Sequence, residues 1–257
     1  MNAKQLMRMS MIAMIAVAIG CGGSKEQATA ASTDTAAAPA AAAGGATGSA
    51  AVTGEVSFKG SAPAATTIKM DADPVCQMQH GSGMTSDEVM ADGGRLANVF
   101  VYVKTGLEGD TFPAPSSPVT LDQHGCWYQP HVLGIQVGQS LEIVNSDGTL
   151  HNINVKPTAN APFNVAQPMQ GMKTTKKFTK PEVMIKTKCN VHPWMSAYIG
   201  VVAHPFFAVT GKDGAFSLAG LPAGTYTVEA WHEKFGTKTQ SVTVADGATQ
   251  AITFEFP

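Results

Sequence analysis

The sequence predicts an all-β protein built from small β-sandwiches, and three observations support this prediction. Beyond residue 51, apolar and polar residues alternate with a period of two, which is typical of half-buried strands. Turn signals recur between these segments, as in Lys212–Gly214 and Pro222–Gly224. A helical period is absent apart from one expected turn near 86–89. The alternating segments include 99–104, 134–137, 141–145 and 252–256.

The first residues have the features of a bacterial export signal. Lys4 and Arg8 precede the apolar run 11–19, which is too short to span a bilayer, and Gly20-Cys21 follows it. We therefore expect residues 1–20 to be a lipoprotein signal peptide and Cys21 to carry the lipid. An ordinary signal that is cleaved elsewhere is the alternative. Residues 21–51 consist almost wholly of Ala, Gly, Thr, Ser and Pro, which predicts a disordered linker.

Export and charge limit the partners of this chain. A lipid anchor predicts a location in the cell envelope, periplasmic or surface-facing. Gly22 lacks the acidic character that, by resemblance to known sorting signals, retains lipoproteins at the inner membrane, and this favours the outer membrane. A net charge of −2 with 14% charged residues indicates neither a nucleic-acid binder nor an acidic tail.

Three cysteines remain once Cys21 is assigned to the anchor, so one of them is unpaired or is a metal ligand. Cys189 is followed closely by a histidine and a methionine, whereas Cys76 and Cys126 lie in loop-like sequence. An oxidising compartment favours disulfides. We therefore predict a Cys76–Cys126 disulfide, with a bond from Cys189 to either of the other two as the alternative.

The segment around Cys189 contains the donor types of a blue-copper site, which needs two imidazoles, one thiolate and a weak axial thioether. Cys189, His192 and Met195 have C-x2-H-x2-M spacing, which allows one loop between two strands to wrap around an ion. His151, directly after the predicted strand 141–145, supplies the second imidazole. This combination favours copper over a satisfied loop histidine or a disulfide at Cys189.

Residues 119–203 resemble the cupredoxins, and among them amicyanin with its short ligand loop. The resemblance rests on Val137-Gly-Gln-Ser-Leu-Glu-Ile-Val-Asn145, on His151-Asn152 and on Cys189-Asn-Val-His-Pro-Trp-Met195. It implies that Cys189, His151 and His192 are equatorial copper ligands, that Met195 is axial, and that Asn152 ties the two ligand loops together. It also implies that electrons pass through an exposed edge of His192, with Pro193 and Trp194 around it as the docking patch.

The C-terminal residues 209–228 resemble the second half of the carboxypeptidase regulatory-like domain, a small transthyretin-like sandwich. Residues 54–60 and 96–103 look like the opening strands of that family. We therefore expect the first part of this sandwich at 52–110, a cupredoxin domain at 116–204 and the second part at 205–257. Simple tandem domains are the alternative.

Two further metal sites are weaker hypotheses. A closed zinc site would use Cys189, His192 and His151 with a fourth thiolate from Cys76 or Cys126. A second site would combine Cys76 and His80 with Cys126, His124 and His131, if these segments met. The predicted disulfide competes with both.

The predicted function is a type 1 copper protein that carries single electrons and is not an enzyme. Two imidazoles, one thiolate and one distant thioether leave no open equatorial position for a substrate. The expected partner is a redox protein such as a c-type cytochrome or another copper protein, and the lipid anchor joins the chain to the membrane. A periplasmic copper-binding or copper-delivery protein without a redox role is the alternative. A surface interaction module is a third reading.

Overall fold

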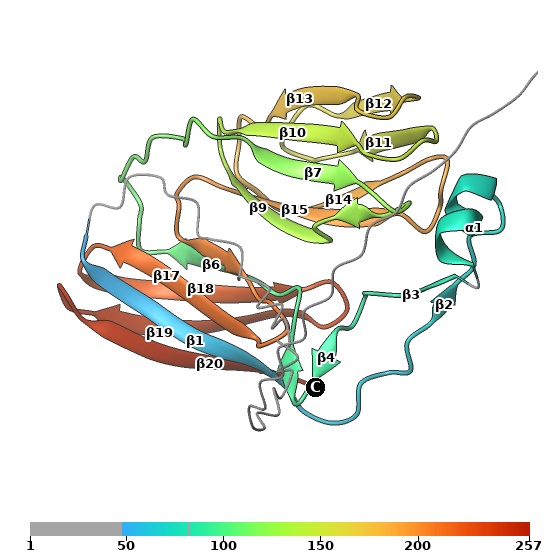
Figure 1. The fold of residues 1–257 in the computed structure, drawn as a ribbon. Coiled ribbons are helices and arrows are strands. Elements are labelled where there is room, and N and C mark those ends of the chain that lie inside the picture. The colour runs from blue at the N-terminus through green and yellow to red at the C-terminus, as the bar shows by residue number, and fades with distance from the viewer. Residues whose placement is uncertain (1–47, 82) are drawn as a thin grey trace, which may run out of the picture. The chain divides into compact units, whose positions relative to one another are not determined.

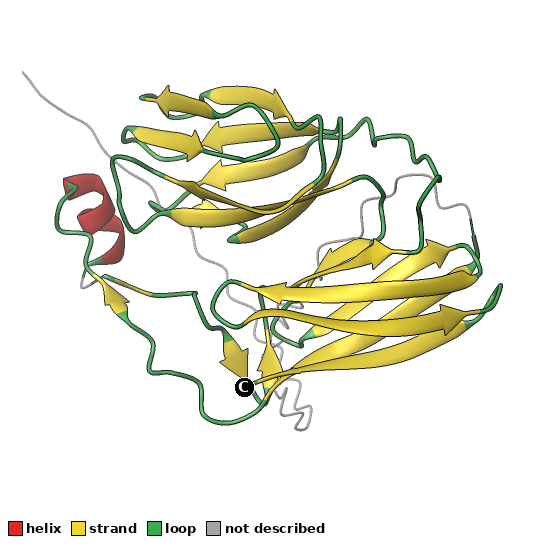
Figure 2. Cartoon of the chain, turned by 180° about the vertical axis from the view of Figure 1, so that it is seen from behind, coloured by secondary structure: helices red, strands yellow, loops and turns green. Residues whose placement is uncertain are grey.

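The computed structural model describes residues 48–81 and 83–257 (Figure 1). Strands make up nearly all of the regular structure in these residues, with one short helix (Figure 2), so the all-β prediction is confirmed. The predicted signal peptide 1–20 and the lipidation site Cys21 lie outside the described residues. The predicted linker 21–51 also lies outside the described residues up to residue 47, and the first strand begins at Ala50, within its last expected residues. Within the described ranges, no helix has the length and apolar character needed to cross a membrane.

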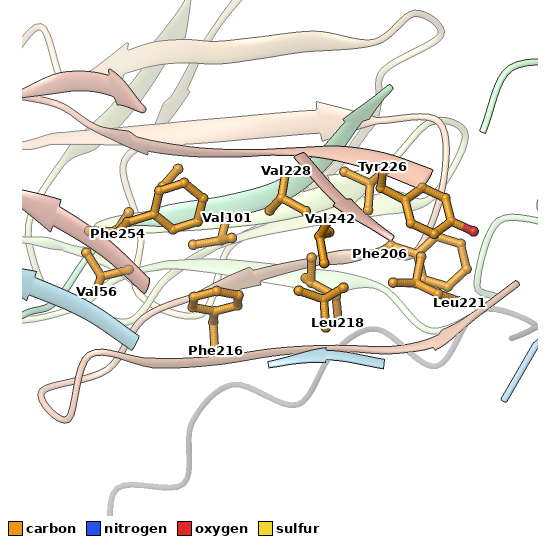
Figure 3. Close-up of a cluster of buried hydrophobic side chains, with 14 of the residues drawn as sticks. Val56, Val101, Phe206, Phe216, Leu218, Leu221, Tyr226, Val228, Val242 and Phe254 are labelled. Atoms are coloured by element: carbon orange, nitrogen blue, oxygen red, sulfur yellow. The ribbon is translucent and has the colours of Figure 1, made fainter. Parts of the chain in front are cut away.

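The first sandwich consists of two sheets that enclose one apolar core. One sheet has the order β17-β1-β5-β4, with β20 also paired to β1, and the other has the order β16-β6-β18-β19. Val56, Phe216 and Val228 are among the side chains that fill the space between them (Figure 3). The strands are β1 (Ala50–Phe58), β4 (Ala91–Asp92), β5 (Arg95–Leu96), β6 (Phe100–Thr105), β16 (Phe207–Val209), β17 (Ala215–Leu221), β18 (Gly224–His232), β19 (Gly236–Val244) and β20 (Thr249–Phe256).

The second sandwich has sheets of the orders β13-β10-β7-β8 and β12-β11-β14-β15-β9. Parallel pairs, β10 with β7 and β15 with β9, occur among antiparallel neighbours. Its buried core includes Leu121, Ile143, Ile199, Cys189 and Met195. The strands are β7 (Val119–Gln123), β8 (Tyr128–Gln129), β9 (Val132–Gln136), β10 (Ser140–Asn145), β11 (His151–Val155), β12 (Phe163–Gln167), β13 (Lys173–Lys177), β14 (Glu182–Lys188) and β15 (Ser196–Val202).

The second sandwich interrupts the first one in sequence. β1 pairs antiparallel with β17 and parallel with β20. β6 pairs antiparallel with β16 and with β18. Strands from before Val119 and from after Val202 therefore share both sheets of the first sandwich, which is the arrangement of an inserted domain and not of tandem domains.

Between β1 and β4 the chain forms a short hairpin and a helix, which the predicted sandwich did not include. The hairpin pairs β2 (Thr67–Ile68) with β3 (Met84–Thr85), and the helix is α1 (Pro74–His80). We call residues 67–81, which hold β2 and α1, the cap. α1 begins where the Asp73 side chain accepts from the backbone N–H groups of Val75 and Cys76, with proline at the first helical position. The expected helical turn near 86–89 is wrong, because no helix forms there.

Aromatic side chains of the first sandwich pack on two glycines of the second. A Cβ built on Gly134 of β9 would lie 2.3 Å from the Phe207 ring, and one built on Gly200 of β15 would lie 2.5 Å from the Phe100 ring. Phe100, Phe207 and Tyr198 belong to one buried cluster. Glycine is therefore needed at both positions, because any side chain would displace the rings.

A buried ionic contact lies beside this cluster. The His131 Nε2 bonds the Glu233 carboxylate, the His131 Nδ1 lies 3.5 Å from an Asp87 oxygen, and the Tyr198 ring packs edge-on against His131. Burial alone would lower the pKa of His131, but Glu233 and Asp87 outweigh it and raise the pKa. Burial alone would raise the pKa of Glu233, but the bond and charge of His131, the Tyr198 hydroxyl and the charge of His232 lower it.

We expect this contact to stabilise the fold most strongly between pH 4.5 and pH 6.5, the ordinary pKa values of glutamate and histidine. As the pH rises through the raised pKa of His131, the stabilisation is lost because the cation is lost. As the pH falls through the lowered pKa of Glu233, it is lost because the carboxylate is protonated. Chemical denaturation of wild type and Glu233→Gln at pH values below, within and above this range measures the effect. A stability difference that does not change with pH would contradict it.

Candidate metal centre

His151 is placed by a polar loop between two strands of opposite sheets. β10 ends at Asn145 and β11 begins at His151. The Asn145 amide donates to the carbonyls of Thr149 and Gln167, at 2.9 and 2.8 Å, and its Oδ1 accepts from the Asp147 N–H. These bonds fix the loop from inside, so the fully buried His151 ring has little freedom.

The ligand loop between β14 and β15 folds back on the Cys189 sulfur. The Cys189 N–H donates to the Met195 carbonyl, and the Met195 N–H donates to the His192 carbonyl. The backbone N–H groups of Val191 and His192 lie 3.3 and 3.4 Å from the Cys189 Sγ. N–H groups directed at a sulfur stabilise the thiolate form. Met195 is fully buried in the same core cluster as Cys189.

The two loops bring two imidazoles and a thiol together. The Nδ1 atoms of His151 and His192 are 3.0 Å apart, and the Cys189 Sγ is 3.9 Å from the Nδ1 of His192. All three ligand atoms lie within 4.8 Å of one another. This set was predicted from the sequence, although His151 and Cys189 are 38 positions apart in the chain.

A carboxylate oxygen lies beside the outer nitrogen of each ring. The His151 Nε2 is 2.8 Å from an Asp147 oxygen, and the His192 Nε2 is 3.1 Å from an Asp73 oxygen. An ionised carboxylate only accepts hydrogen bonds, so each Nε2 must donate. In the neutral form of each ring, the free lone pair is then on Nδ1 and faces the other imidazole and the Cys189 sulfur.

The charge state of the centre also differs from that of free side chains. Burial alone would raise the pKa of the Cys189 thiol, but hydrogen bonds from His151, His192 and the loop backbone lower it to about 6. Burial would lower the pKa of His151, yet Asp147 and Cys189 raise it to about 8. For Asp147, burial would raise the pKa, but His151 and two backbone N–H groups lower it to about 2.

This donor set fits a copper ion. Two nitrogen lone pairs and a sulfur of thiolate character converge on one buried space, with a thioether in the same cluster. Two imidazoles, one thiolate and a weak thioether are the donors of blue-copper sites. Two lone pairs that face each other at 3.0 Å repel unless a cation lies between them, so the geometry itself requires a proton or a metal ion.

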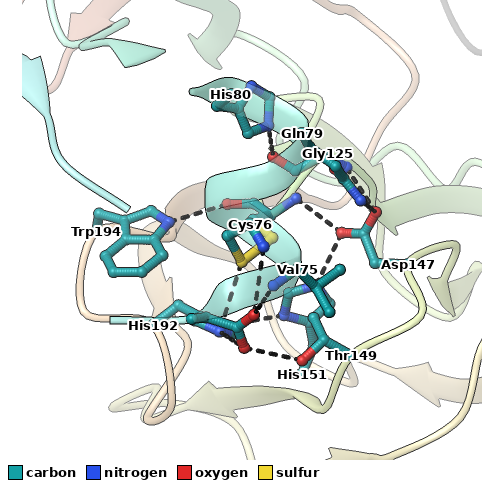
Figure 4. The surroundings of a disulfide bond; sticks show 12 residues. Val75, Cys76, Gln79, His80, Gly125, Asp147, Thr149, His151, His192 and Trp194 are labelled. Atoms are coloured by element: carbon teal, nitrogen blue, oxygen red, sulfur yellow. Dashed lines mark hydrogen bonds and ion pairs between the residues drawn. A yellow bond between two sulfur atoms is a disulfide. The ribbon is translucent and has the colours of Figure 1, made fainter. Parts of the chain in front are cut away.

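The expected exposed edge of His192 is wrong. His192 is only 1% exposed, because the cap lies over its outer edge (Figure 4). Asp73 bonds the His192 Nε2, and the Cys76 Sγ lies 3.7 Å from the same nitrogen. The two predicted docking residues differ in their exposure to solvent. Pro193 is exposed, whereas Trp194 is half-buried, with its ring 5.1 Å from the His192 ring and its Nε1 donating to the Cys126 carbonyl.

Asn152 joins the two ligand loops, as the resemblance implied. Its Oδ1 accepts from the Asn190 N–H at 2.7 Å, and its amide donates to the Asn164 side chain. The Tyr128 hydroxyl donates to the Asn152 carbonyl at 2.5 Å. The segment that follows His151 is therefore tied to the residue that follows Cys189.

The two weaker metal sites are not formed. Cys76 and Cys126 are joined in a disulfide, so neither offers a fourth thiolate for a closed zinc site. His80 bonds the Gly125 carbonyl, and His131 pairs with Glu233 on another face, so these rings do not gather around the two cysteines. Among the described residues, Cys189 is the free cysteine.

Two site residues were missed by the sequence analysis, namely Asp73 and Asp147. Asp73 carried a readable signal, because aspartate followed by proline is typical of a helix start. That signal could have located α1, but nothing local connects Asp73 with His192, which is 119 residues away. Asp147 lies four residues before His151, and this spacing has no meaning in a loop.

One family model matches part of this chain. Residues 196–257 match the family model of the carboxypeptidase regulatory-like domain. The match begins within β15, which pairs with β14 and β9 of the second sandwich, and it leaves out β1 and β6. No curated protein matches this chain.

Solved structures similar to this chain include copper proteins. A copper-containing nitrite reductase from Thermus scotoductus SA-01 is 30% identical over 36% of this chain and 24% of its own, with a TM-score of 0.32. A purple cupredoxin from Nitrosopumilus maritimus is 22% identical over 34% of this chain and 99% of its own, with a TM-score of 0.29. A Cu(I) form of a mutant amicyanin is 19% identical over 33% of this chain and 81% of its own, also with a TM-score of 0.29. This chain spans about a quarter of the reductase.

Proposed function

We propose that this protein is a type 1 copper protein that carries single electrons in the bacterial cell envelope. The observation that carries the proposal is the convergence of the His151 Nδ1, the His192 Nδ1 and the Cys189 Sγ on one buried space. A copper ion held by this set would supply one reversibly exchanged electron. The hydrogen bonds within both loops support such a role, because a site that moves little between two oxidation states transfers electrons readily.

The surroundings of the centre favour electron transfer over substrate chemistry. The three ligand residues and Met195 are each buried, so a substrate has no path to the ion. The expected partner is a redox protein such as a c-type cytochrome or another copper protein, and a lipid on Cys21 would hold this chain at the membrane, within reach of such a partner. Val191, which is 42% exposed and whose N–H lies 3.3 Å from the Cys189 sulfur, offers such a partner a contact point beside the thiolate.

The visible absorption spectrum tests this proposal. The chain without residues 1–21 is loaded with Cu(II) and compared with Cys189→Ser. We expect an intense band from thiolate-to-copper charge transfer in the wild type and its complete loss in the variant, because serine offers no soft sulfur donor. Asn190→Ala serves as a loop control and should keep the band. A colourless wild type would contradict a type 1 centre.

The cap favours a second candidate function, a copper-binding or copper-delivery protein without a redox role. A His192 ring covered by Asp73 and by a disulfide lies farther from any redox partner than an exposed ring would, which slows electron transfer without preventing metal binding. Electron self-exchange and copper transfer to an apo acceptor distinguish the candidates. Fast self-exchange with retained copper supports the carrier, whereas slow self-exchange with complete transfer supports delivery.

A further inference from the structure

The cap places a carboxylate on the outer edge of His192, opposite the nitrogen that faces the centre. Asp73 uses its two oxygens for different tasks. Its Oδ1 accepts from Val75 and Cys76 at the start of α1, at 2.8 and 3.2 Å. Its Oδ2 accepts from the His192 Nε2 at 3.1 Å and from the Thr149 hydroxyl at 2.9 Å. One side chain of the cap therefore contacts both ligand loops.

Asp147 does the same for the other imidazole. Its Oδ2 accepts from the His151 Nε2 at 2.8 Å and from the Cys126 N–H at 2.7 Å, and its Oδ1 accepts from the Gly125 N–H at 2.9 Å. Gly125 and Cys126 belong to the loop that the disulfide ties to the cap. The disulfide thus joins the helix that Asp73 caps to the loop whose N–H groups orient Asp147.

We propose that Asp73 and Asp147 are positioning residues, which hold the protons of His192 and His151 on Nε2 so that both Nδ1 lone pairs face Cys189. This inference rests on the proposed copper site. A carboxylate behind a ligand imidazole fixes its tautomer and its orientation and raises its basicity as a donor. Two such carboxylates favour the higher-charged ion, so the pair stabilises Cu(II) relative to Cu(I) and lowers the reduction potential.

The cap is then a part of the metal centre and not only a cover. Without it, His192 would have no carboxylate partner and its ring could place the proton on either nitrogen. With Nδ1 protonated, the ring offers no lone pair to a metal. The contribution of the cap is therefore chemical, through Asp73, and it depends on α1 because the N-cap bonds fix the orientation of that carboxylate.

Asp73→Asn is the variant that separates position from structure. Asparagine is as good an N-cap as aspartate, so α1 and the disulfide should be retained. With its oxygen on the helix N–H groups, its amide would face the His192 Nε2 as a donor. We expect the proton of His192 to move from Nε2 to Nδ1, which long-range proton–nitrogen NMR spectra of the full metal-free chain detect directly.

The same variant should bind metal more weakly. We expect the affinity for Zn(II), a colourless probe of the donor set, to fall about 10-fold to 100-fold in Asp73→Asn and in Asp147→Asn. Asp122→Asn is the matched control, because Asp122 bonds the Ser146 hydroxyl at 2.9 Å and contacts no imidazole. It removes the same charge and should change neither the tautomer nor the affinity.

The outcomes are distinct. An unchanged His192 tautomer in Asp73→Asn overturns the proposal, even where the Cu(II) protein is blue. A fall in affinity without a change of tautomer also overturns it, because Asp73 would then act only through the fold. If Asp73→Asn does not fold, Asp147→Asn decides, read at His151 in the metal-free chain at a pH where the ring is neutral, and a proton that stays on Nε2 there overturns the proposal. A colourless Cu(II) protein ends the electron-carrier proposal but leaves this test intact.

Discussion

Replacement of Cys76 and Cys126 by alanine is expected to lower the free energy of unfolding by about 2 to 5 kcal/mol. The two residues are 50 positions apart and both are fully buried, so their bond removes much conformational freedom from the unfolded chain. The cap should also loosen, because its remaining anchors are the polar contacts of Asp73 with His192 and Thr149 and the packing of Met70 in the cluster around Trp127. Chemical denaturation measures the first effect and backbone hydrogen exchange over 67–81 the second.

The functional consequence of losing this bond is faster exchange of the bound metal. His192 is covered by the cap, and opening the cap exposes its outer edge. Reduction of the wild-type disulfide by a dithiol should reproduce the effect of the double variant. Cys189→Ser, which leaves the disulfide intact, should retain protected amides in the cap. Unchanged backbone hydrogen exchange in residues 67–81 after reduction of the disulfide would show that the cap is held by its other contacts.

Phe100→Ala is expected to destabilise the fold by about 3 to 5 kcal/mol. Phe100 is fully buried, its ring packs on Gly200 of the second sandwich, and it lies 5.7 Å from the Phe207 ring. Its removal leaves a cavity that the rigid sheets on either side fill only in part. We also expect the single unfolding transition to separate into two, because this cluster couples the sandwiches. Denaturation followed by fluorescence and by circular dichroism detects the separation.

A matched aromatic control is Phe163→Ala. Phe163 lies on β12, is only partly buried, and packs against the core of the second sandwich alone. Phe163→Ala should lower the free energy of unfolding by less than Phe100→Ala does and should leave a single cooperative transition. Equal losses in the two variants, with one shared transition in each, would show that the contact between the sandwiches contributes nothing specific to stability.

Strands were predictable because their signal is local. The alternation in 141–145 and 252–256 follows from side chains that point to opposite faces of a sheet, and β10 and β20 include these residues. The insertion was predictable only through resemblance, since no local pattern states that β1 pairs with β17 and β20. α1 was missed because a seven-residue helix with one buried residue, Cys76, shows no helical period.

In the candidate metal centre, too, the residues with a local signal were predictable and the contacts between distant segments were not. Cys189, His192 and Met195 lie in one short loop, so their spacing indicates that they can bind the same ion. His151 follows a strand that the alternating pattern predicts. Asp147 and Asp73 were not readable as partners of the imidazoles. The hydrogen bond from His192 to Asp73 joins residues 119 positions apart. Such a contact exists only because the cap folds onto the loop.

By itself, the sequence determined the all-β class, the donor types of the centre and the cysteine left free for it. Each of these depends on residue identity and short-range spacing. Only the tertiary structure decided that His192 is closed off, that a disulfide lies against it, and that both imidazoles have carboxylate partners. These properties depend on how the cap packs, and packing between segments far apart in the chain is set by the complementarity of whole surfaces, which no local pattern encodes.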